Sequence, residues 1–209
     1  SYLDLSKLGG KPPKSLRNIQ IKPRQHLINK MLENRHLTRF IIAPCMYGKS
    51  CLAAAYAKTI FNYNHCIWLD CSSPCFIRDI DSGIFDKFFR ENIGNIRLAV
   101  FDNLGVLIGQ RAECFCQTLR YLESRNVEVI INSLPYDDSL ESEFLDRIVI
   151  DSTELMLNYH EMIEQMNIDK DFMFKNMRMS AIENTISNLN TKNSRDTNEI
   201  IDQLKSVKF

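Results

Sequence analysis

Short apolar runs alternate with longer amphipathic segments over most of this chain. The apolar runs cover residues 39–43, 65–70, 97–102, 127–132 and 147–150. The segments between them, near residues 51–61, 80–92 and 112–124, have the spacing and composition of helices. Strands that alternate with helices in this way predict a parallel sheet covered on both faces, and its strands are expected to be continuously apolar. We therefore predict an α/β fold.

The two ends of the chain differ from this middle part. Residues 1–22 are rich in Lys, Gly and Pro without a clear period, which predicts an arm or linker. An amphipathic helix is expected after Pro23. Beyond residue 151, polar breaks separate helical segments at 161–167, 171–188 and 196–207. We predict a core over residues 23–151 and a C-terminal helical lid or extension over residues 152–209.

One turn between a predicted strand and a predicted helix has the pattern of a phosphate-binding loop. It fits the frame G-x-x-x-x-G-K-[ST], except that Ala43 stands in place of the first glycine. Gly-Lys-Ser alone is a common tripeptide, but the order strand, loop, helix supports a P-loop. The residues expected to surround the phosphates are Pro44, Cys45, Met46, Tyr47, Gly48, Lys49, Ser50 and Cys51.

The chemistry of such a loop explains its residue types. Backbone N–H groups and the helix N-terminus favour an anion, and Gly48 lets the backbone approach it closely. Lys49 supplies positive charge for the β- and γ-phosphates, and Ser50 can place a hydroxyl on magnesium. The expected ligands are ATP and Mg²⁺.

Polar residues also end the neighbouring strands. Asp102 follows an apolar strand in the form of a Walker B segment, whose aspartate binds magnesium directly or through water. The next residue, Asn103, can orient a water molecule but cannot accept its proton, so hydrolysis is expected to be slow. Asp70 is either a substitute carboxylate or a plain strand-end cap. Asn132 is either a contact to the γ-phosphate region or a loop opener. The catalytic candidates are Lys49, Asp102, Asn103 and Asn132.

Composition narrows the class of protein. Seven cysteines at irregular spacings make a poor disulfide framework and no zinc-ribbon pattern, which predicts reduced thiols and a cytoplasmic location. The formal net charge is zero, which argues against a dedicated electrostatic grip on nucleic acid. No apolar run is long enough to span a bilayer and no secretory signal opens the sequence, so no membrane association is expected.

These motifs resemble the ATPase module of large LuxR-type transcription regulators, maltose-regulon activator-like members of the signal-transduction ATPases with numerous domains. That family commonly has Ala-Pro-Ala-Gly-Tyr-Gly-Lys-Thr in its P-loop. The residues shared with it are Ala43, Pro44, Tyr47, Gly48 and Lys49. The run from Trp68 to Asp70 also resembles the family's Trp-Leu-Ser-Leu-Asp strand.

The resemblance implies a five-stranded parallel sheet of order 5-1-4-3-2, nucleotide-driven switching and oligomerisation on ATP binding. It also implies that Arg24 lies near the nucleotide, the alternative being a solvated arginine at a helix start. The sequence departs from the family at Asn103, where a second acid is usual, and no arginine follows Asn132. No DNA-binding helix-turn-helix is recognised, so DNA binding is not expected from this chain itself.

Three functions stay open at this point. The first is an ATP-binding regulatory switch of a bacterial signalling or transcription regulator, with a protein partner or self-association on ATP binding. The second is an AAA-type loader or remodelling ATPase, which would need an arginine from a neighbouring subunit; Arg125 and Arg147 are candidates. The third is a nucleotide-binding interaction module that hydrolyses little, which Asn103 favours. A small-molecule kinase has less support, because no arginine-bearing lid is evident.

Overall fold

The described part of the chain forms one sheet with helices on both faces. The computed structural model describes residues 12–13, 16, 24–45, 47–136 and 146–156. In this part the strands form a five-stranded sheet in the order β2-β3-β4-β1-β5, and each pair of neighbours is parallel. Counted from the other side, this is the predicted order 5-1-4-3-2. The predicted α/β fold is confirmed.

The strands coincide closely with the apolar runs of the sequence. Their bounds are β1 (Thr38–Ile42), β2 (Cys66–Asp70), β3 (Leu98–Leu104), β4 (Glu128–Ser133) and β5 (Arg147–Ile150). All six residues of β4 are buried, as expected for a central strand covered on both faces. Because β4 lies between β1 and β3, the polar residues that end it stand between the P-loop and Asp102.

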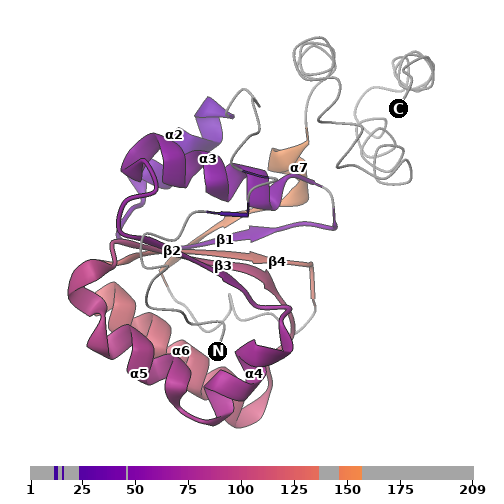
Figure 1. Ribbon diagram of the computed structural model, residues 1–209. Coiled ribbons are helices and arrows are strands. Elements are labelled where there is room, and N and C mark those ends of the chain that lie inside the picture. The colour runs from indigo at the N-terminus through magenta and orange to yellow at the C-terminus, as the bar shows by residue number, and fades with distance from the viewer. Residues whose placement is uncertain (1–11, 14–15, 17–23, 46, 137–145, 157–209) are drawn as a thin grey trace, which may run out of the picture.

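The helices divide into two layers (Figure 1). One face of the sheet is covered by α2 (Gln25–Glu33), α3 (Lys49–Phe61) and the short α7 (Ser152–Leu155). The other face is covered by α4 (Pro74–Asp81), α5 (Ile84–Glu91) and α6 (Gly109–Ser124). Phenylalanine rings from this second layer and from β3 pack mainly edge to face: Phe76, Phe85, Phe89, Phe101 and Phe115. These apolar layers hold the strand ends in fixed positions.

The single helix predicted over residues 80–92 is wrong. The structure has α4 and α5 there, separated by Gly83 at φ 80°. A left-handed residue ends a helix, and glycine adopts it without a Cβ penalty. Helix α4 also begins earlier than predicted, because Ser73 caps it by accepting a hydrogen bond from the Cys75 N–H and Pro74 occupies its first turn.

Several predicted segments lie outside the described residues. They are the arm over residues 1–22 apart from residues 12–13 and 16, the helices predicted beyond residue 156, and Met46 of the P-loop. Among the described residues, no helix combines the length and the apolar character needed to cross a membrane.

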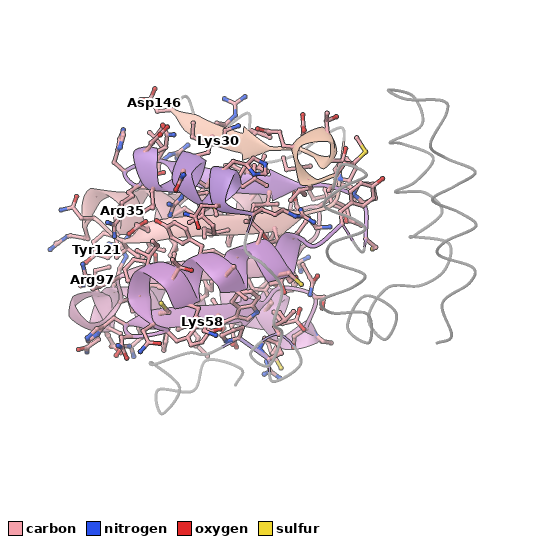
Figure 2. All side chains as sticks on the ribbon, turned by 90° about the horizontal axis from the view of Figure 1, so that it is seen from above. Lys30, Arg35, Lys58, Arg97, Tyr121 and Asp146 are labelled. Atoms are coloured by element: carbon pink, nitrogen blue, oxygen red, sulfur yellow. The ribbon has the colours of Figure 1, made fainter. Side chains whose placement is uncertain are left out.

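The parallel strands all begin at one edge of the sheet and end at the opposite edge. Figure 2 shows Arg35, Tyr121 and Arg97 along the edge where the strands begin. The P-loop and the polar ends of β3 and β4 lie at the opposite edge, because they follow the last residues of their strands. In open α/β sheets this second edge is where ligands bind.

Candidate functional site

The predicted P-loop is a turn from β1 into α3. Gly48 is the residue that caps α3, at φ 82°, and Lys49 is the first residue of the helix. The first-glycine position is filled by Ala43, whose methyl group is fully buried in the core between the sheet and α3. Its N–H donates to the Ser133 carbonyl at 3.2 Å, which ties the start of the loop to the end of β4. Alanine therefore fits at the first position of the loop because its methyl group packs into the core.

The Lys49 side chain folds back over the loop. Its Nζ donates to the Ala43 carbonyl at 2.7 Å and to the Pro44 carbonyl at 2.9 Å. Burial lowers the pKa of this amine, and the nearby Asp102 carboxylate partly offsets the effect. The loop thus encloses a buried amine beside the helix N-terminus, where a phosphate would replace carbonyl oxygens as the acceptor.

Three side chains from α3, β3 and β4 meet next to this lysine. The Ser50 hydroxyl lies 2.8 Å and 3.0 Å from the two carboxylate oxygens of Asp102 and donates to them. The Asn132 Nδ2 donates to Asp102 Oδ1 at 3.0 Å. Asp102 and Asn132 are both buried, and burial raises the pKa of the Asp102 carboxyl in spite of these hydrogen bonds.

The residues present fit a magnesium–phosphate group. Mg²⁺ is usually held by one or two carboxylates together with substrate phosphates, and Asp102 with Ser50 offers such a partial set of oxygen ligands. Within the described ranges, no cluster of three or more His, Cys, Asp or Glu could form a metal site from protein alone. The Asn132 Oδ1 is buried and has no hydrogen-bond partner among the described residues, so it is available to a polar ligand group.

Two further polar side chains lie beside Asp102. In the register of β2 and β3, Asp70 is paired with Asp102. The Asn103 Nδ2 donates to Asp70 Oδ1 at 3.3 Å. The same Asp70 oxygen accepts from the Ser72 N–H at 3.0 Å and from the Ser72 hydroxyl at 2.6 Å. Ser72 was missed by the sequence analysis, although Asp-x-Ser at a strand end is a signal for such a turn.

Arg24 and Cys51 complete the predicted set. The Arg24 guanidinium reaches the Tyr47 carbonyl at 3.5 Å, next to Gly48, so this arginine at the start of α2 does lie against the P-loop. Cys51 is half-buried in the first turn of α3, and burial raises the pKa of its thiol to about 11. Because this thiol is neutral and not a thiolate, Cys51 would contact an anion through its backbone N–H group.

The structure thus brings together most of the predicted site residues at one edge of the sheet. Hydrogen bonds join Ser50, Asp102 and Asn132. The side chains of Lys49 and Arg24 donate to backbone carbonyls of the adjacent P-loop. Tyr47 is buried, whereas Pro44 and Cys45 are exposed on the loop. All seven cysteines are free thiols in the structure.

Comparison with known proteins identifies the fold. No protein-family model and no curated protein matches the chain. A solved structure of the replication initiator DnaA bound to AMPPCP and single-stranded DNA is similar, with 19% identity and a TM-score of 0.54 over 95% of this chain and 66% of that one. A structure described as a DNA replication initiation factor gives 17% identity and a TM-score of 0.57, over 94% of this chain and 64% of that one. The chain has the fold of P-loop NTPases.

A third similar structure covers a single domain. It is domain III of DnaA from Thermotoga maritima, with 14% identity and a TM-score of 0.51 over 94% of this chain and 98% of that one. By contrast, the chain spans about two thirds of the length of the first two structures. At these identities the likeness establishes the P-loop NTPase fold.

Proposed function

We propose that this chain is a switch domain that binds ATP with magnesium and hydrolyses it slowly. The observation that carries the proposal is the hydrogen-bonded group of Ser50, Asp102 and Asn132 beside the buried Lys49 amine. Three different elements supply these side chains, and all of them lie next to a strand–loop–helix turn capped by a left-handed glycine. This combination fits a bound phosphate chain better than a structural role, because it places two buried charges at the open edge of a sheet.

Each residue has a defined part in this proposal. The N–H groups at the start of α3 and the Lys49 amine bind the phosphates, and the amine exchanges its loop carbonyls for phosphate oxygens. Ser50 and Asp102 supply oxygen ligands for the metal, and Asn132 contacts the γ-phosphate region. Magnesium, when bound, neutralises charge on the β- and γ-phosphates. Arg24 lies where it can sense whether the loop around Gly48 is filled.

The second part of the proposal concerns the class of protein to which this domain belongs. The similar structures are replication initiators, one of them bound to AMPPCP and single-stranded DNA, which supports an AAA-type initiator or loader. The P-loop residues shared with LuxR-type regulators support a transcription regulator, but the fold does not favour it over the first type. The zero net charge gives no support for DNA binding by this chain. We therefore propose that ATP binding controls the interaction with a protein partner or self-association.

The proposal is tested by nucleotide binding to the 209-residue chain. Lys49→Ala removes a buried ammonium, so its affinity for a fluorescent ATP analogue with Mg²⁺ is expected to fall about tenfold or more. Lys58→Ala is the matched control, because Lys58 is an exposed lysine of the same helix. Equal affinities for wild type and Lys49→Ala would contradict the proposal.

A further inference from the structure

The pair Asp70 and Asn103 lies at the site but has no part in the binding scheme above. Strand β3 is irregular at this point: Phe101 pairs with Ile131 and Leu104 with Ser133, so β3 contains one residue more than β4 over the same distance. Asn103 lies within this bulge at φ 55°. Bulges turn a side chain away from the regular alternation of a strand and are common next to active sites. Here the bulge brings the Asn103 side chain to Asp70 on β2.

The contact with Asp70 fixes which way the Asn103 amide faces. An ionised carboxylate only accepts hydrogen bonds, so the amide must present its NH₂ group to Asp70. The amide oxygen, an acceptor, is then directed away from Asp70. Asp70 is itself held by both hydrogen bonds from Ser72. The backbone N–H of Asn103 also donates to Asp102 Oδ1 at 3.1 Å, which ties the residue to the proposed metal ligand.

We propose that Asp70 is a positioning residue for hydrolysis: it orients the Asn103 amide so that the amide oxygen accepts a hydrogen bond from the attacking water. This inference rests on the proposed function. It gives Asp70 a role different from a strand-end cap and from a carboxylate that removes the proton. Asn103 touches the water, and Asp70 acts through it.

Hydrolysis of ATP by this route needs no protein side chain as a base. The water oxygen forms a bond to the γ-phosphorus while the bond between that phosphorus and the β–γ bridging oxygen breaks, giving ADP and phosphate. An amide accepts a hydrogen bond but takes no proton, so the water's proton passes to a phosphate oxygen of the nucleotide. The amide supplies orientation alone, which explains why the rate is expected to be low.

Replacement of Asp70 separates this role from nucleotide binding. Asp70→Asn keeps the size of the side chain but lets the amide at position 103 turn either way. Phosphate release in a single turnover, with enzyme in excess over radiolabelled MgATP, is expected to slow about tenfold or more, as is typical when a reacting group is misplaced. The dissociation constant for MgATP is expected to stay within about twofold, since Asp70 is exposed and outside the phosphate-binding loop. Asp81→Asn is the control, because Asp81 is an exposed carboxylate that contacts Arg111 at 2.8 Å.

The reciprocal exchange gives the sharper test. Asn103→Asp alone places a third carboxylate next to Asp70 and Asp102, so it is expected to lose the hydrogen bond and to release phosphate more slowly than wild type. The double variant Asp70→Asn with Asn103→Asp restores one amide and one carboxylate in contact, with the carboxylate now next to the water. Its rate is expected to equal or exceed that of the wild type. A double variant that is faster than Asn103→Asp alone would show that the partner at position 70, and not the new carboxylate by itself, sets the rate.

The outcomes are distinct. The inference is overturned if Asp70→Asn releases phosphate as fast as wild type, if the double variant is no faster than Asp70→Asn, or if wild type binds MgATP and releases no phosphate. Failure of wild type to bind MgATP would overturn the proposed function and this inference with it. Because binding is measured separately from release, the two failures are not confused.

Discussion

Gly48 is the residue whose backbone decides whether the loop can form. Its φ of 82° is unfavourable for any residue with a Cβ, and an added methyl group would lie 3.2 Å from Arg24 Nη2. Gly48→Ala is expected to cost about 1–2 kcal/mol of folding free energy and to displace the Arg24 guanidinium. We also expect its affinity for MgATP to fall clearly, as measured by titration calorimetry.

Gly83 offers a matched control for this substitution. Its φ is 80°, and an added Cβ would have no heavy atom of the described residues within 4 Å. Gly83→Ala is therefore expected to cost a similar amount of stability in urea unfolding while MgATP affinity is unchanged. A loss of affinity in both variants would mean that backbone strain, and not the site, causes the effect.

Asp102 is a buried carboxylate whose ionisation costs folding free energy. Burial raises the pKa of its carboxyl group, so the stability that the protonated form contributes is lost as pH rises through that pKa. At neutral pH the ionised group therefore destabilises the protein. Asp102→Asn, measured without nucleotide or metal, is expected to melt at a higher temperature than wild type at pH 7, with a smaller difference at pH 4, close to the ordinary pKa of an aspartate.

The same variant is expected to lose the ligand response. MgATP stabilises a protein that binds it by an amount set by its concentration relative to the dissociation constant. The melting temperature of wild type is expected to rise with MgATP, whereas that of Asp102→Asn stays unchanged. If Asp102→Asn melted lower than wild type at both pH values, the carboxylate would be a structural residue.

At the scale of elements, a buried ion pair joins β1, β4 and α3 near the edge where the strands begin. Arg39 is fully buried, and its Nη1 lies 3.1 Å from Glu128 Oε1. The Tyr56 hydroxyl of α3 donates to the same oxygen, and Arg35 donates to Glu128 Oε2 at 2.8 Å. The Glu128 carboxylate thus connects β1, β4 and α3 at the edge of the sheet that Arg35 marks in Figure 2.

Removal of the Glu128 carboxylate is expected to lower the free energy of unfolding strongly. Glu128→Gln leaves the Arg39 charge buried without an anionic partner, which typically costs about 3 kcal/mol or more. Urea unfolding should show a lower midpoint with an unchanged slope. Glu91→Gln is the control, because it removes a carboxylate from an exposed pair with Lys87 that is expected to contribute less than about 0.5 kcal/mol. Similar losses in the two variants would contradict the importance of burial.

The same elements show what the sequence could and could not predict. Apolar runs predicted all five strands because most positions are apolar in a strand of a parallel sheet that helices cover on both faces. Strand ends predicted Asp102 and Asn132, since parallel strands end at the same edge. The contact between Asn103 and Asp70 was not predictable, because it depends on a bulge that only the register with β4 shows. The pairing of Arg39 with Glu128 was also missed, since each is a charged residue in an apolar run whose partner lies on another strand.

At the scale of the whole molecule, an arginine from a second copy separates the AAA-type proposal from a monomeric switch. Of the two candidates, Arg125 is exposed at the end of α6, whereas Arg147 is half-buried in β5. The guanidinium carbon of Arg125 lies 5.2 Å from the ring centre of Tyr121. Figure 2 shows Tyr121 at the edge where the strands begin. Arg125 therefore cannot reach the P-loop of its own subunit, so any contact with a nucleotide would be with one bound by a neighbouring subunit.

This arrangement predicts that hydrolysis depends on protein concentration. If a neighbour supplies Arg125, phosphate released per molecule rises with concentration, and sedimentation velocity shows larger species with Mg-AMPPCP than with ADP. Arg125→Ala is expected to lose the concentration dependence while MgATP affinity is unchanged, because an arginine that stabilises the transition state acts on the rate. Arg97→Ala is the control, as an exposed arginine at the same edge that lies over Phe61. A rate per molecule that is constant over a hundredfold range of concentration, about the span needed to populate a weak complex, would exclude the arrangement and favour a switch that works as a single subunit.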